Sequence, residues 1–166
     1  MKVSKPEEIV VELLNTKQEK TVNSEQLLRR SDIYDNGTTF EDMENLENLN
    51  EAELLYNLQL RFAKDLIYTY VGPTLLVVNP FKLIEALFKR ETLNIYFKIA
   101  LRNQSYKDVA PHTYGKAATM YKQLFDSKKN QSLIISGESG AGKTETAKHA
   151  MQFLTTLCNT KLYKSD

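Results

Sequence analysis

The residues best suited to chemistry form one short segment, residues 137–144, which reads Gly-Glu-Ser-Gly-Ala-Gly-Lys-Thr. It matches G-x-x-x-x-G-K-[ST], a pattern expected by chance in a chain of this length with a probability of roughly half a percent. Backbone N–H groups of small residues can wrap a polyphosphate, and the first N–H groups of a following helix point at the same anion. Lys143 would set an ammonium against the outer phosphates, and Thr144 would offer its hydroxyl to Mg²⁺. The segment therefore predicts a polyphosphate site.

Two elements must hold such a loop, a strand before it and a helix after it. Residues 133–135 are a short apolar run, which predicts a buried strand. Residues 143–159 predict a helix, because their apolar residues recur every three or four positions. These residues are Ala147, Ala150, Met151, Leu154, Leu157 and Cys158. Since Cys158 lies on this stripe, we expect a buried thiol. The alternative is a glycine-rich turn that opens an ordinary helix.

The first third of the chain predicts a hairpin, a linker and a helix. Residues 8–14 and 19–23 are rich in β-branched residues and predict the hairpin, and the polar residues 31–39 are typical of a linker. Asn50 has the character of a helix cap. The helix that follows would bury one apolar face. That face consists of Leu54, Leu55, Leu58 and Phe62.

The middle of the chain predicts two strands and then two helices. Residues 66–70 and 74–78 read as strands, and the second is apolar enough to be covered on both faces. Residues 83–101 predict a helix in two pieces that meet near Lys89, and residues 113–125 predict another. Buried strands with covering helices indicate an α/β fold.

Composition excludes several classes of function. Lys and Arg number 22 against 21 Asp and Glu, so the net charge of +1 does not attract nucleic acid or an acidic membrane. No apolar run approaches the roughly 18 residues of a membrane span, and the start lacks the apolar stretch of a secretory signal. One cysteine excludes an internal disulfide framework and fits a reducing compartment. We expect a soluble, cytoplasmic chain with no nucleic-acid partner and no membrane insertion.

Two weaker candidates for chemistry favour structural interpretations. His112 and His149 lack the spacing of metal ligands, which indicates packing or surface residues. Asn-Pro-Phe-Lys at residues 79–82 follows a predicted strand and is typical of a strand-ending turn.

Several motifs together resemble the start of a myosin motor domain. The phosphate loop followed by Glu145 has the myosin form, and Pro111 and His112 before a helix with Tyr121 are also similar to this family. Three longer segments are similar to it as well, namely residues 46–65, residues 68–73 (Tyr-Thr-Tyr-Val-Gly-Pro) and residues 79–82. Residues 9–30 resemble the end of the small β-barrel that precedes many myosin motors. The resemblance covers almost the whole chain.

The resemblance implies an α/β fold of the P-loop NTPase type. It would be a partial myosin-head core, with an incomplete sheet and covering helices. Residues 1–35 would be the remnant of the small β-barrel, and residues 36–166 the N-terminal segment of the motor domain. Lys116 stands in a stretch that departs from the family pattern, and its burial would be costly without a partner.

The resemblance also implies ATP and Mg²⁺ as ligands. The phosphates would be bound by Gly137, Glu138, Ser139, Gly140, Ala141, Gly142, Lys143 and Thr144, with Thr144 also a magnesium ligand. Asn79, Pro80, Phe81 and Lys82 would line the adenine side. Phe88 would replace an aromatic residue that the family carries shortly after this motif.

By this resemblance the function is ATP binding in an actin-based cytoskeletal motor. The switch segments that the family uses for hydrolysis are not among these residues, so we assign no catalytic residue and expect no hydrolysis from them alone. Most of the actin-binding surface also lies elsewhere in the family. The alternative is a non-catalytic product that binds a nucleotide or a partner protein. An unrelated P-loop kinase or GTPase is disfavoured, because such folds usually place the loop near the start of the domain.

Overall fold

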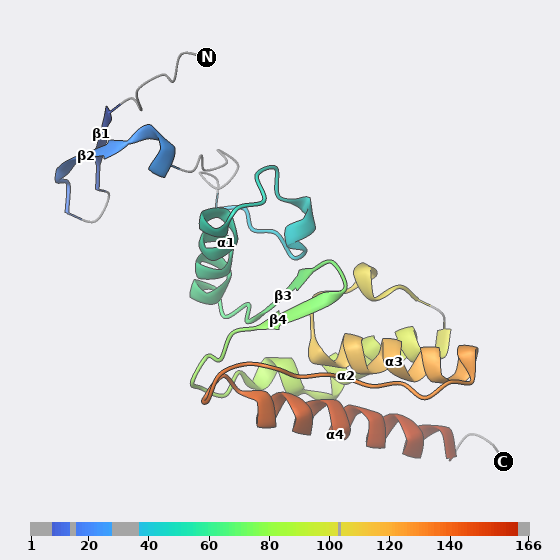
Figure 1. Cartoon of the computed structure of the whole chain (residues 1–166). Coiled ribbons are helices and arrows are strands. Elements are labelled where there is room, and N and C mark those ends of the chain that lie inside the picture. Colours follow the sequence, from blue (N-terminus) through green and yellow to red (C-terminus); the bar gives the residue numbers. More distant parts are fainter. Residues whose placement is uncertain (1–7, 14–15, 28–36, 103, 163–166) are drawn as a thin grey trace, which may run out of the picture.

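The computed structural model describes residues 8–13, 16–27, 37–102 and 104–162 (Figure 1). These ranges hold helices and two small antiparallel sheets, which confirms a mixed α and β composition. The strands are β1 (Glu8–Glu12), β2 (Glu19–Asn23), β3 (Tyr68–Val71) and β4 (Thr74–Val77). The α-helices are α1 (Glu51–Ala63), α2 (Arg90–Arg102), α3 (Thr113–Ser127) and α4 (Lys143–Leu162).

The predicted N-terminal hairpin is confirmed. β1 and β2 pair in antiparallel register, with Ile9 opposite Val22. A two-stranded hairpin is marginally stable in water and needs further packing. The assignment of residues 1–35 to a barrel remnant stays a prediction, and residues 1–7, 14–15 and 28–36, which include most of the predicted linker, lie outside the described residues.

Helix α1 begins as predicted, but its most deeply buried residues are polar. The side chain of Asn50 accepts a hydrogen bond from Glu53 N at 3.0 Å, which caps the helix. The buried residues are Glu53, Asn57 and Arg61, whereas Leu55 is 68% exposed. The predicted apolar face is confirmed for Leu54 and Leu58, which are partly buried against Met43 and Leu46, and is wrong for Leu55 and Phe62, which are exposed. The buried polar side of α1 faces the backbone of neighbouring segments, and polar side chains are needed to satisfy its hydrogen-bonding groups.

Arg61 joins α1 to strand β3. Its Nε donates to Thr69 Oγ1 at 2.9 Å, and its Nη2 donates to the Tyr68 carbonyl at 2.9 Å. Burial lowers the pKa of this guanidinium, and these hydrogen bonds compensate for part of its desolvation. Asn57 similarly pairs with both backbone groups of Phe40. The polar face of α1 thus orients the sheet that precedes the candidate site.

Strands β3 and β4 form the second sheet, with Thr69 opposite Leu76. The outer edge of β3 is covered in part, because Tyr70 N donates to the Glu41 carbonyl at 2.7 Å. Strand β4 is only half-buried. The prediction that both of its faces are covered is wrong, because Thr74 is exposed and the other three residues of the strand are only partly buried.

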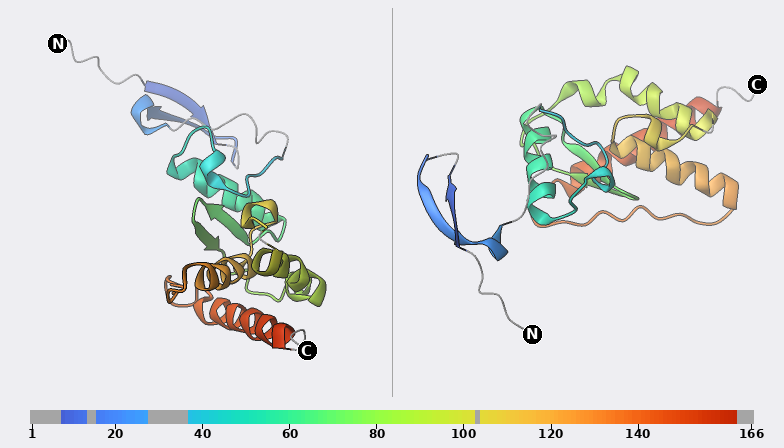
Figure 2. Two further views of the ribbon diagram at one scale, coloured as in Figure 1. Left: turned by 90° about the vertical axis from the view of Figure 1, so that its right-hand side faces the viewer. Right: turned by 90° about the horizontal axis from the view of Figure 1, so that it is seen from above.

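Helices α2, α3 and α4 form the main core, with α3 packed against both of the others (Figures 1 and 2). The predicted helix in two pieces is confirmed as a 3₁₀ turn, Glu85–Phe88, followed by α2, with the break at Lys89. The rings of Tyr114 and Phe153 stack at 5.1 Å inside this core. The core residues are Leu93, Tyr96, Ile99, Tyr114, Ala117, Ala118, Tyr121, Ala150, Phe153 and Leu157.

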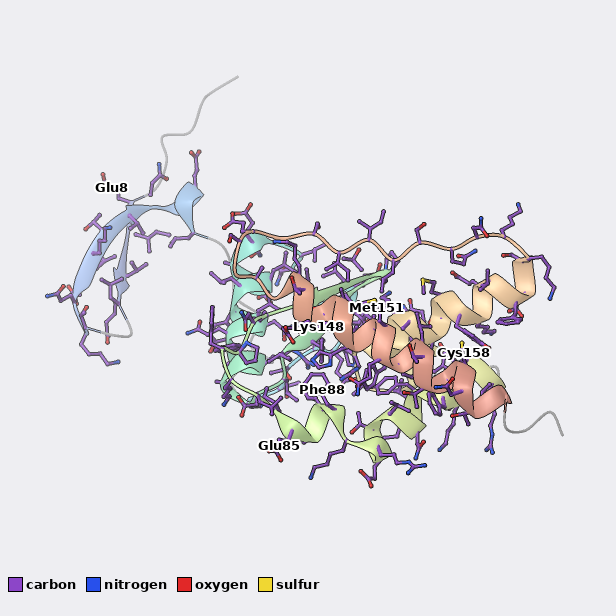
Figure 3. The ribbon with its side chains drawn as sticks, turned by 90° about the horizontal axis from the view of Figure 1, so that it is seen from below. Glu8, Glu85, Phe88, Lys148, Met151 and Cys158 are labelled. Atoms are coloured by element: carbon purple, nitrogen blue, oxygen red, sulfur yellow. The ribbon has the colours of Figure 1, made fainter. Side chains whose placement is uncertain are left out.

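The structure corrects two expectations near the loop. Residues 133–135 form no strand, although burial alternates from residue 131 to residue 136 as it does along a strand. A strand needs a hydrogen-bonding neighbour, and among the described residues neither sheet includes residues 133–135. Cys158 is exposed, and Met151 is 59% exposed, because α4 turns Ala150, Phe153 and Leu157 inward (Figure 3).

Candidate phosphate-binding site

Residues 137–142 form a tight bend that leads directly into α4. Gly140 and Gly142 have φ values of +78° and +94°, in the region that favours glycine. Ala141 N donates to the Glu138 carbonyl at 3.2 Å, and Thr146 N donates to the Gly142 carbonyl at 2.9 Å as the helix begins. The bend and the helix thus match the sequence prediction, while the strand before them does not form.

Lys143 reaches back over this bend. Its Nζ donates to the carbonyl of Gly137 at 2.8 Å and to the carbonyl of Glu138 at 2.7 Å. An ammonium has three N–H donors, so one remains for another acceptor. Thr144 is exposed at the first turn of α4. Both side chains lie at the positive end of the helix dipole, where anions are stabilised.

Asn79 joins residues 79–82 to the bend by a hydrogen bond. Its Nδ2 donates to the Gly140 carbonyl at 2.7 Å, across 61 positions in the sequence, and its Oδ1 accepts from Phe81 N at 2.9 Å. A Cβ at Gly142 would lie 3.9 Å from the Asn79 Cβ, so the two backbones run close together. The structure therefore brings residues 79–82 and 137–144 into one site.

Unlike Asn79, Phe81 and Lys82 do not bond to the bend through their side chains in the described structure. The Phe81 side chain is 86% exposed, at a backbone φ of +51°. Lys82 forms an ion pair with Asp65, with Nζ 2.7 Å from Oδ1. Both residues, with Pro80, border the cavity beside the bend. Most of the residues that line this cavity therefore come from outside residues 79–82.

The cavity has a volume of about 390 Å³ and lies between residues 79–84, strand β3 and the start of α4. Its walls include Tyr68, Val77, Ile84, Phe88, Thr146 and His149. Phe88 lies where the resemblance placed an aromatic residue, whereas His149 was not expected there. The position of His149 could have been predicted from the sequence. Gly142, Thr146 and His149 are spaced by four and three positions, so they share one helix face.

A second cavity of about 400 Å³ lies on the other side of the bend, between β4 and residues 133–137. Lys116 borders it and donates to the Pro73 carbonyl. Its Nζ lies 5.0 Å and 4.8 Å from the ring centroids of Tyr70 and Tyr106. Partial burial lowers the pKa of Lys116, and these contacts supply partners for its half-buried ammonium.

His112 is a packing residue, as the sequence favours. It is buried, and its Nδ1 accepts a hydrogen bond from Tyr114 N at 3.0 Å, which caps α3. Burial lowers the pKa of His112 to about 3, so the ring is neutral in the folded chain. Among the described residues, no group of three or more His, Cys, Asp or Glu side chains is placed to hold a metal ion.

We predict that His112 makes the folded chain sensitive to acid. Between pH 6.5 and pH 3 the unfolded chain binds a proton at this position and the folded chain does not, so the stability falls as the pH falls. Lowering the pH from 7.5 to 5.5 should reduce the free energy of unfolding by about 1.4 kcal/mol more than in His112→Asn, which retains a capping side chain. Urea denaturation at the two pH values measures this difference, and an equal loss in both proteins would contradict it.

Comparison with known proteins places this sequence in a family. The family model for the myosin head (motor domain) matches residues 40–165, which include both the bend and residues 79–82. The chain belongs to the myosin motor-domain family. Myosin-4 of Arabidopsis thaliana is 51% identical over 117 residues, which cover 70% of this chain and 10% of that protein.

Two further myosins match more of the chain. The myosin-M heavy chain of Dictyostelium discoideum is 40% identical over 92% of this chain and 8% of its own length. Myosin-1 of Arabidopsis thaliana is 42% identical over 91% of this chain and 12% of its own length. This myosin sequence thus spans about a tenth of the relatives it matches. No helix in the described residues is both long and apolar enough to cross a membrane.

Proposed function

We propose that this chain is the ATP-binding N-terminal segment of an actin-based myosin motor, with a core of the P-loop NTPase type. The observation that carries the proposal is the bend at residues 137–142, with the Lys143 ammonium folded over it and Asn79 joined to it. In the complete motor, ATP hydrolysis would drive movement along actin in the cytoskeleton. In this interpretation residues 1–35 precede the motor segment as a barrel remnant.

The residues present fit a nucleoside triphosphate with magnesium. The positive φ values of Gly140 and Gly142 let backbone N–H groups turn toward a common centre. The remaining N–H of Lys143 would bind an outer phosphate oxygen, and the hydroxyl of Thr144 would bind Mg²⁺. The metal, when bound, neutralises charge on the phosphates.

The base would lie beside residues 79–82. Asn79 and Pro80 border the cavity of about 390 Å³, which begins at Ala141 and Gly142 on the bend. This volume lies within the range of small-molecule sites. The nucleotide would therefore extend from the bend along one face of α4.

We predict that Thr144→Val removes the effect of Mg²⁺ on ATP binding. In the unmodified chain, Mg²⁺ should tighten ATP binding about tenfold, because the metal links the phosphates to this hydroxyl. The variant lacks that oxygen and should bind ATP equally well with Mg²⁺ or with a chelator. Isothermal titration of ATP under the two conditions measures the ratio.

Thr155→Val is the matched control. Thr155 is exposed on the same helix, and its hydroxyl donates to the Met151 carbonyl, so its removal should leave the effect of Mg²⁺ intact. Failure of the unmodified chain to bind ATP in either condition would overturn the proposed function. A tenfold effect of Mg²⁺ that persists in Thr144→Val would overturn the role of Thr144 alone.

A further inference from the structure

A groove separates helices α2 and α4 on the surface of the core. Both helices pack against α3, and the space left between them has a volume of about 470 Å³. Helix α4 borders the groove from Gln152 onward, ten residues past Gly142, which corresponds to about 15 Å along the helix axis. Among the described residues, Phe88 alone borders both this groove and the cavity beside the bend (Figure 3). The two spaces are therefore separate.

The floor of the groove is apolar. Leu93 is buried, and the half-buried Phe97 contacts the buried ring of Phe153, with 5.3 Å between centroids. Leu101, near the end of α2, is 41% exposed. Leu93, Phe97 and Leu101 are spaced by four positions, so they form one line along the helix. A ligand that covers this line would remove apolar surface from water, which is favourable.

The rim of the groove on α2 is positively charged. Arg90, Lys98 and Arg102 border it and are exposed. Within the described part of the chain no carboxylate borders the groove, and none of these three side chains forms an ion pair. Glu91, the acidic residue of α2, is not among the residues that border the groove. The groove thus carries three positive charges on a chain whose net charge is only +1.

The spacing of these charges indicates an extended ligand. Arg90 and Lys98 are eight positions apart, and Lys98 and Arg102 are four apart, which corresponds to about 12 Å and about 6 Å along the helix axis. A single phosphate group would contact one or two of these cations and leave the apolar floor uncovered. A flat lipid surface does not reach into a groove. A protein segment can place carboxylates at the cations and apolar side chains on the floor, as peptides do in other grooves between helices.

We propose that the groove between α2 and α4 binds an acidic, partly apolar segment of a partner protein. The apolar side chains of that segment would cover the floor, and its carboxylates would pair with the three cations of the rim. Charge complementarity selects the partner, because charges at the rim speed association with an acidic segment and reject a basic one. The inference does not rest on nucleotide binding, because the proposed nucleotide site is the bend and the cavity beside it.

Binding of a fluorescent peptide, measured by anisotropy, tests the inference. The peptide has about twelve residues, with leucine at every third or fourth position and glutamate at most of the others, so that it presents both kinds of side chain. Lys98→Glu should weaken its binding about tenfold, because a like charge then lies on the rim. Leu101→Ser should weaken it about fivefold, because less apolar surface is covered. Added salt should also weaken binding, since the rim is exposed.

Two controls separate the groove from general attraction by charge. Lys129→Glu makes the same change of net charge at an exposed position outside the groove, and it should alter affinity less than twofold. A polyglutamate peptide of the same length has no apolar side chains and should bind about tenfold more weakly than the first peptide. Circular dichroism of each variant shows whether the fold is kept.

Several results would overturn the inference. These are no binding of the leucine-containing peptide, an equal loss of affinity in Lys98→Glu and Lys129→Glu, and binding of polyglutamate as tight as that of the first peptide. Tighter binding of a single-stranded oligonucleotide or of phosphatidylserine vesicles, lost in Lys98→Glu, would assign the groove to another class of ligand and would overturn it as well. None of these results bears on ATP binding at the bend, which titration with ATP measures separately.

Discussion

Replacing Lys143 by alanine is expected to weaken ATP binding about a hundredfold. Its Nζ lies over the bend, held by the carbonyls of Gly137 and Glu138, and one N–H remains for a phosphate oxygen. A hydrogen bond to a charged group contributes about 1.5–3 kcal/mol, which corresponds to about one to two orders of magnitude in affinity. Loss of the ammonium also leaves those two carbonyls facing the phosphates. Isothermal titration of both proteins with ATP and Mg²⁺ measures the change.

Lys129→Ala is the control for the loss of a positive charge. Lys129 is exposed between α3 and the bend, and its removal should change ATP affinity less than twofold. Equal affinities of Lys143→Ala and the unmodified chain would contradict the proposed position of the phosphates. A similar loss in both variants would indicate that net charge alone attracts the nucleotide.

Replacing Asn79 by leucine is expected to weaken binding of ATP and of inorganic triphosphate by the same factor, about tenfold. The bond from Asn79 Nδ2 to the Gly140 carbonyl fixes the bend, and leucine has a similar volume without a donor. The bend must then be ordered by the ligand, at the expense of affinity. An equal effect on the two ligands distinguishes this role from contact with the base.

Asn94→Leu provides the matched control for Asn79→Leu. Asn94 is exposed on α2, and its replacement should alter neither affinity. The comparison is made by titration with each ligand in turn. A loss confined to ATP would show that Asn79 acts on the base and not on the bend.

Elements whose signals are local could be predicted from the sequence. The cap at Asn50, the break at Lys89 and the start of α4 at Lys143 all depend on residues within one or two turns. The bend at residues 137–142 was predictable for the same reason. Its glycines adopt the positive φ angles that their type permits, whatever surrounds them.

Features that depend on distant neighbours could not be predicted in this way. Apolar spacing showed that Leu55 and Phe62 could be buried, but the backbone groups near α1 required Arg61 and Asn57 instead. Residues 133–135 have the composition of a strand but no partner strand in the described chain. Strand formation is decided by the neighbour as much as by the segment.

The candidate site shows the same division. The sequence singled out residues 137–144 and residues 79–82 separately, and their roles in binding stay predictions. The bond between Asn79 and Gly140 shows that the two segments lie together. His149 was expected to be a packing or surface residue, because it and His112 lack the sequence spacing of metal ligands. Its position emerges only when Phe88, 61 positions earlier, is seen stacked on its ring.

In the proposed function, the bend and the first two residues of α4, residues 137–144, hold the triphosphate. Nuclear magnetic resonance of the ¹⁵N-labelled chain tests it directly, since each backbone N–H gives its own signal. On addition of ATP and Mg²⁺, we predict that the largest shifts occur at Gly140, Gly142, Lys143 and Thr144. Saturating ATP that leaves these four signals in place, or shifts only signals elsewhere in the chain, would contradict the account.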